Sequence, residues 1–94
     1  MPDTKWDESD VERVLEWYEQ EPSDALIGEE VLRDLSLVEL RELFGVRPDN
    51  REDPAMYHAY PVEQSHVARI QRAVHHRLEL DRFDYFVAAY QRGT

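Results

Sequence analysis

The sequence contains no cysteine, only three glycines and no apolar run of membrane-spanning length. The absence of cysteine excludes disulfide bonds, thiol catalysis and cysteine-ligated zinc, and it favours the cytoplasm as the compartment. The first ten residues are acidic and polar, which is not the pattern of a secretory signal. Gly28, Gly45 and Gly93 stand apart from one another, so they form no phosphate-binding loop. We therefore expect a cytoplasmic protein with no membrane-spanning segment.

Residue patterns typical of catalytic sites are also missing from the sequence. The four histidines include no pair spaced four apart on a helix and no adjacent acid in a zinc-hydrolase pattern. Each serine has a capping or turn explanation, and none stands in a glycine-flanked nucleophile elbow. Carboxylates are so abundant that no pair stands out as a general acid and base. We expect no catalytic residues, no metal, no cofactor and no enzymatic activity.

The chain does contain enough apolar residues for one small core. Its 94 residues are 41% hydrophobic and include two tryptophans, five tyrosines and three phenylalanines, although 34% are charged. A chain of this length can bury roughly 60 to 65% of its unfolded surface in a single domain. We expect one domain over residues 1–94, in which residues 1–9 form a loosely ordered leader.

The clearest predicted element is a helix over Leu35–Phe44. Ser36 is a favourable N-cap, Glu39 follows three residues later as in a capping box, and Gly45 supplies the left-handed residue that commonly ends a helix. One face of this helix is apolar and must pack on another element; it consists of Leu37, Leu40, Leu43 and Phe44.

A second helix is predicted over Ser65–Leu78, with Ser65 as its cap. Its apolar face consists of Val67, Ile70, Val74 and Leu78. Residues 81–90 fit a strand with Phe83, Tyr85 and Val87 on one side, although the alanines there also suit a helix.

The sequence pattern of the first part of the chain indicates its secondary structure less clearly. Val11–Gln20 fits either a helix or a strand, and its local spacing slightly favours a helix. Residues 21–24 form a turn, and the apolar residues that follow are interrupted by Gly28, which indicates a strand with a bulge or bend. Residues 47–54 are polar and contain two prolines, so they predict an exposed loop that can serve as a contact surface. Pro61 indicates that the segment around it lies at a sheet edge.

The formal net charge of −10 is concentrated in the first part of the chain. Residues 1–56 contain seventeen acidic and six basic residues, whereas residues 57–94 contain four acidic and five basic residues. Such a field repels nucleic acid and anionic membranes, and it accelerates association with cationic proteins. A solubilising surface without a charged partner explains the same charge, so both interpretations stay open at this point.

Three segments of the chain, Leu35–Val46, Asp53–Val62 and Leu80–Phe86, resemble a family of small acidic bacterial proteins. Members of that family are associated with polymorphic and contact-dependent toxins. The resemblance implies a β-hairpin over residues 13–32 and a further strand over Phe83–Val87. With the two helices, it predicts an α+β fold in which a small antiparallel sheet carries two helices packed on one face.

The resemblance also implies an immunity protein that binds a cognate toxin protein one to one and neutralises it. A toxin that cleaves nucleic acid has a basic cleft, which an acidic surface would capture rapidly. The predicted contact residues are carboxylates of the hairpin and the following loop, with one tyrosine as an aromatic anchor: Glu19, Glu21, Asp24, Glu29, Glu30, Asp49, Glu52, Asp53 and Tyr57. The alternative is an acidic adaptor or nucleic-acid mimic that binds a basic protein other than a toxin. In neither hypothesis is nucleic acid or a membrane the ligand.

Overall fold

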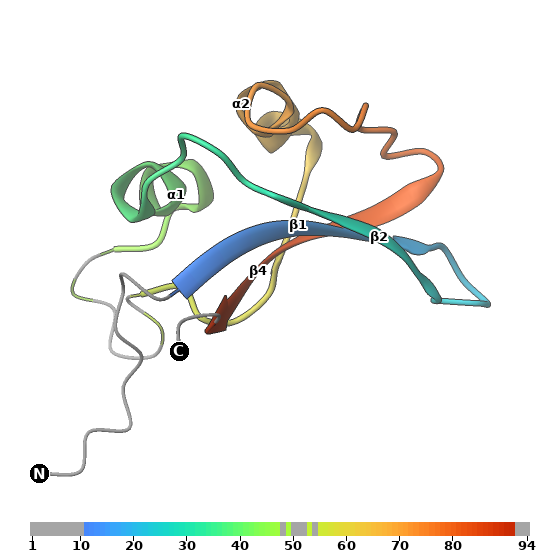
Figure 1. Ribbon diagram of the computed structural model, residues 1–94, viewed down its shortest axis with the longest axis horizontal. Coiled ribbons are helices and arrows are strands. Elements are labelled where there is room, and N and C mark those ends of the chain that lie inside the picture. Colours follow the sequence, from blue (N-terminus) through green and yellow to red (C-terminus); the bar gives the residue numbers. More distant parts are fainter. Residues whose placement is uncertain (1–10, 48, 50–52, 54, 92–94) are drawn as a thin grey trace, which may run out of the picture.

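A four-stranded antiparallel sheet with two helices on one side forms the fold (Figure 1). The computed structural model describes residues 11–47, 49, 53 and 55–91, so the predicted leader lies outside the described residues. The order of the strands across the sheet is β2-β1-β4-β3; they are β1 (Val11–Glu19), β2 (Leu26–Val31), β3 (Tyr60–Pro61) and β4 (Phe83–Gln91). The predicted α+β class is confirmed, and Pro61 lies on an edge strand as expected.

β1 is an inner strand that pairs with β4 along its whole length and with β2 on its other side. The slight local preference for a helix over Val11–Gln20 is therefore wrong, and the hairpin over residues 13–32 is confirmed. Val14 and Leu15 are adjacent, so their side chains point to opposite faces of the sheet, yet they are only 1% and 0% exposed. A strand buried on both faces shows no simple alternation of apolar and polar residues, which is why the local pattern was ambiguous.

The hairpin contains a bulge at the position that Gly28 predicts. The pairing runs from Trp17 opposite Gly28 to Tyr18 opposite Leu26, which leaves Ile27 as the extra residue. A Cβ atom at position 28 would lie 2.6 Å from the indole ring of Trp17. Glycine therefore allows the indole ring to lie directly on the β2 backbone.

The first predicted helix is confirmed together with both of its caps. α1 spans Leu37–Phe44, Ser36 and Glu39 form a reciprocal capping box, and Gly45 ends the helix with a φ of 71°. Leu40 is fully buried in the core between the helices and the sheet, alongside Leu15, Ile70 and Tyr85. The two helices thus cover the face of the sheet that carries Leu15 and Tyr85.

The second predicted helix is real but much shorter than expected. A 3₁₀ turn, η2 (Gln64–His66), leads into α2 (Val67–Gln71), so a helix over Ser65–Leu78 capped by Ser65 is wrong. Beyond Gln71, the carboxylate of Glu30 accepts hydrogen bonds from the backbone N–H groups of His75 and His76, at 2.6 and 2.9 Å. Because a continuing helix would use these N–H groups internally, a residue 45 positions away in the sequence ends it.

Candidate functional site

The sheet face opposite the helices is the candidate functional site, and we call it the helix-free face. The register of the strands places Glu16 beside Phe86, Tyr18 beside Asp84 and Glu12 beside Tyr90 on it. Its strand residues are Glu12, Val14, Glu16, Tyr18, Leu26, Glu29, Val31, Pro61, Asp84, Phe86, Ala88 and Tyr90. The fold therefore brings residues from all four strands to a face that neither helix covers, and on this face Val14, Glu16 and Ala88 are buried.

Glu16 is the centre of a hydrogen-bonded group on this face. Its carboxylate accepts hydrogen bonds from the hydroxyl of Tyr18, at 3.0 Å, and from the hydroxyl of Tyr90. Although Glu16 points away from the helices, it is only 4% exposed. The carboxylate thus fixes the positions of two tyrosine side chains on the surface.

Hydrogen bonding, burial and nearby negative charges together raise the pKa values of both tyrosines. The hydrogen bond to Glu16, followed by burial and by the charges of Glu16, Tyr18 and Glu29, raises the pKa of Tyr90 from 10.0 to about 12. For Tyr18, burial raises the pKa first, and the bond to Glu16 and the charges of Glu16 and Glu29 add to it. Both hydroxyls therefore remain neutral hydrogen-bonding groups at physiological pH.

Acidic and aromatic side chains dominate the helix-free face. Its strand residues include four carboxylates and no basic residue: Glu12, Glu16, Glu29 and Asp84. Among its aromatic residues, Tyr18 and Phe86 meet edge to face, with ring centroids 5.8 Å apart and planes at 83°. Tyr90 is 37% exposed and Leu26 is 54% exposed. Such a surface offers apolar contact area as well as negative charge to a partner.

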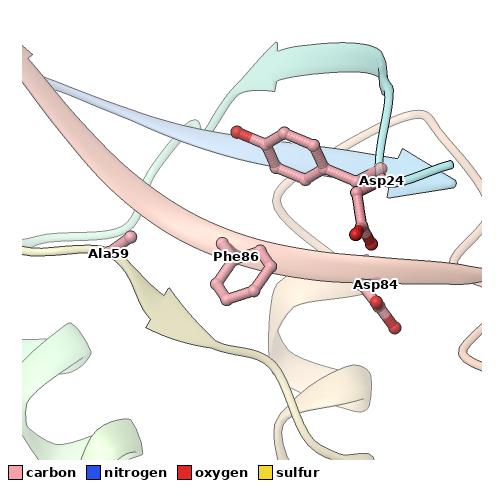
Figure 2. A pocket seen from close by; sticks show the side chains of 5 residues that line it. Asp24, Ala59, Asp84 and Phe86 are labelled. Atoms are coloured by element: carbon pink, nitrogen blue, oxygen red, sulfur yellow. The ribbon is translucent and has the colours of Figure 1, made fainter. Parts of the chain in front are cut away.

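A hollow of about 370 Å³ opens on the same face. It is lined by Tyr18, Asp24, Ala59, Asp84 and Phe86. In Figure 2, Asp24 comes from the hairpin turn, Asp84 and Phe86 come from β4, and Ala59 immediately precedes β3. With Tyr18 on β1, four parts of the chain therefore build the hollow, which joins the helix-free face to the hairpin turn.

The structure places four of the nine predicted contact residues together at the hairpin. Glu19, Glu21, Asp24 and Glu29 are all exposed, at the end of β1, in the turn and on β2. Asp24 adopts the left-handed backbone conformation, with a φ of 53°. Glu29 belongs to the helix-free face, and the other three adjoin this face and extend its negative charge.

Two other predicted contact residues instead hold the fold together. Glu30 binds the backbone of His75 and His76, and Asp53 is only 8% exposed, so the expected exposure of Asp53 is wrong. The Asp53 carboxylate accepts hydrogen bonds from the backbone N–H groups of Tyr57 and His58 and from the hydroxyl of Tyr60, at 2.8, 3.0 and 2.6 Å. The residues between Asp53 and β3 thus fold around this carboxylate.

Hydrogen bonding lowers the pKa of both of these carboxyl groups. Burial alone would raise the pKa of Asp53, but the bonds from Tyr60, His58 and Tyr57 outweigh it and bring the pKa below the ordinary 3.8. Burial alone would also raise the pKa of Glu30, but the two hydrogen bonds from backbone N–H groups after α2 outweigh burial, so the pKa is lowered. Each group is therefore an anion bound by the protein's own donors.

The remaining predicted contact residues lie apart from the hairpin group. Tyr57 is half-buried, and the guanidinium of Arg13, near the start of β1, lies 5.6 Å from its ring centroid. Asp49 is exposed and forms a surface ion pair with Arg47 at 3.1 Å. Glu52 lies outside the described residues. Tyr57 is thus at the opposite end of β1 from the hairpin carboxylates.

Apart from Glu29, sequence reasoning missed the strand residues of the helix-free face. Glu16, Tyr18, Asp84, Phe86 and Tyr90 were not among the predicted contact residues. Alternation would have grouped the even-numbered residues within each of the strands Val11–Glu19 and Phe83–Gln91. The register then places both groups on one face.

The fold and this face define a small α+β domain with an acidic and aromatic surface on one side of its sheet. The chain belongs to the family described as a domain of unknown function, DUF7683, which it matches over residues 12–88. A comparison with curated proteins finds no match. Within the described residues there is no helix that could span a membrane, and there is no group of three or more potential metal ligands.

Proposed function

We propose that this protein is an immunity protein that binds a cognate toxin domain, one to one, through the helix-free face and the adjoining hairpin. The observation that carries the proposal is the composition of that face: four carboxylates and three aromatic side chains, with no basic residue among its strand residues. In this proposal the toxin is of the cationic nuclease type, whose basic cleft complements such a surface.

The face has the two properties that rapid and tight capture requires. Its carboxylates supply a field that steers a cationic partner and raises the association rate. Tyr18, Phe86 and Tyr90 supply rigid aromatic contact area, the kind of residue that dominates interface energetics. Because Glu16 already fixes both tyrosine hydroxyls, little side-chain entropy of these two residues is lost when a partner docks.

Co-expression with the toxin domain encoded by the neighbouring gene tests this proposal. The protein should restore growth and form a one-to-one complex of nanomolar or tighter affinity, roughly −12 kcal/mol, by calorimetry. Charge reversal at Glu29 and Asp84, both exposed on the helix-free face, should abolish protection. The matched control reverses Glu42 and Glu63, which are exposed on or next to the helical elements, and should retain protection.

Each outcome of this experiment distinguishes the proposal from its alternative. Loss of protection in both double variants would mean that total charge matters and the face does not. Absence of binding to any neighbouring toxin, combined with tight binding to another basic protein, would favour an acidic adaptor or nucleic-acid mimic.

A further inference from the structure

We propose that the hollow beside the hairpin receives an arginine side chain of the basic partner. This inference rests on the proposed function, in which a cationic protein binds the helix-free face, and it names the part of that partner that is recognised. The hollow is lined by Tyr18, Asp24, Ala59, Asp84 and Phe86.

The walls of the hollow are largely apolar and aromatic. The ring of Tyr18 meets that of Phe86 edge to face, with ring centroids 5.8 Å apart. Next to β3, the hollow is lined by the small side chain of Ala59. The hydrogen bond from the Tyr18 hydroxyl to the Glu16 carboxylate holds the Tyr18 ring in place. Stacking on aromatic faces is characteristic of the weakly hydrated, planar guanidinium group and much less so of an ammonium group.

Two carboxylates from different segments lie at this hollow. Asp24 comes from the hairpin turn and Asp84 from β4 (Figure 2). Within the part of the chain that the structure describes, neither carboxylate forms a hydrogen bond or an ion pair. Both add negative charge to the lining of the hollow, which favours a cationic occupant. A guanidinium has five N–H donors, so it can bind more than one carboxylate acceptor.

The charge of the protein argues against a second copy of this chain as the occupant. A second copy would bring a further net charge of −10 to a face that is already acidic. The occupant we infer is therefore an arginine from a protein of opposite charge.

NMR titration of the full ¹⁵N-labelled chain with three glycine-flanked pentapeptides tests the inference directly. Their central residues are arginine, lysine and citrulline, of which citrulline has nearly the shape of arginine but no charge. The arginine peptide should shift the amide signals of Tyr18, Asp24, Ala59, Asp84 and Phe86 in a saturable manner. The lysine peptide should bind several-fold more weakly, and the citrulline peptide should leave these signals unchanged.

Matched substitutions separate binding in the hollow from attraction by the overall negative charge of the protein. Asp24→Asn and Asp84→Asn should each weaken binding of the arginine peptide by about threefold, as expected for exposed charge pairs. Asparagine tolerates the left-handed conformation at position 24, so the turn should persist. Asp81→Asn is the control, because Asp81 is exposed and three residues from Asp84 but does not line the hollow.

The inference is overturned if the arginine peptide produces no shifts centred on the hollow, or if Asp81→Asn weakens binding as much as Asp84→Asn. Equal binding of the lysine peptide would also contradict it, as would concentration-dependent shifts of the same signals without peptide, which would indicate self-association. The titration needs no toxin. Arginine binding without toxin neutralisation would therefore refute only the immunity function, and neutralisation without arginine binding would refute only this inference.

Discussion

Replacing Asp53 with asparagine should destabilise the fold by at least about 1.5 to 3 kcal/mol, because asparagine cannot accept all of the bonds that Asp53 accepts. One carboxylate oxygen accepts from the backbone N–H of Tyr57, and the other accepts from the N–H of His58 and the hydroxyl of Tyr60. Asparagine has one acceptor oxygen and one NH₂ group. In either orientation of the amide, at least one backbone N–H faces the NH₂ group and loses a charge-assisted bond.

Urea unfolding at neutral pH measures this loss, with an unchanged m-value showing that the two-state comparison holds. The matched control is Asp49→Asn, because Asp49 is exposed and its ion pair with Arg47 involves two side chains that are 73% and 80% exposed. An exposed pair of this kind contributes about 0 to 1 kcal/mol. If Asp53→Asn and Asp49→Asn have the same small effect, the conclusion that the hydrogen bonds to the Asp53 carboxylate stabilise the fold is refuted.

The effect of Asp53→Asn should also depend on pH in a defined direction. The folded pKa of Asp53 lies below the ordinary value of 3.8, so its stabilisation is fully present above that value. It is lost as the pH falls through the lower folded pKa, where the carboxylate becomes protonated. The stability difference between wild type and variant should therefore be constant near neutrality and shrink in strong acid. A difference that grows on acidification would contradict the direction of the shift.

Three further predictions concern the core, the hairpin and the tyrosines. Leu40→Ala should cost about 2 to 5 kcal/mol in a thermal or urea melt, because Leu40 is fully buried; an unchanged melt would refute its place in the core. Gly28→Ala should cost about 1 to 3 kcal/mol, because its Cβ would lie 2.6 Å from the Trp17 ring; wild-type stability would show that the ring moves freely. Glu16→Gln should lower the pKa of Tyr90 from about 12 towards 10.0 in an ultraviolet titration. In the wild type, the stabilisation from this tyrosine is complete below pH 10 and is lost as the pH rises through about 12, and an unaltered titration in the variant would contradict the hydrogen bond.

The elements that sequence analysis predicted correctly are those whose determinants are local. The Leu37–Phe44 helix is specified by Ser36, Glu39 and Gly45, all of which lie within or beside it. The bulge beside Gly28 and the edge position of Pro61 likewise follow from the conformational limits of single residues.

The features that local sequence patterns missed depend on contacts between distant residues. The end of α2 is set by Glu30, and the strand conformation of Val11–Glu19 is set by its pairing with β4. Neither contact can be read from a local window of the sequence. A local preference for a helix is only a weak indication, and pairing with distant strands overrides it.

The candidate site was predicted only in part, for a similar reason. Net charge located the acidic residues of the hairpin, but it could not separate the exposed Glu29 from Glu30, whose carboxylate is bound by the protein itself. Asp53 was misread because a polar loop can still surround a buried, hydrogen-bonded carboxylate. The pairing of Tyr18 with Asp84 needs the sheet register, which only the fold supplies.

The salt dependence of the association rate with the toxin domain is the most direct test of the central claim. In stopped-flow measurements, the wild-type rate should fall steeply with added salt, while the dissociation rate changes less. The double charge reversal at Glu29 and Asp84 should slow association and flatten its salt dependence. The reversal at Glu42 and Glu63, with the same change in net charge, should leave both closer to wild type. If the Glu42 and Glu63 variant is slowed as much or more, the helix-free face is not the surface that captures the partner.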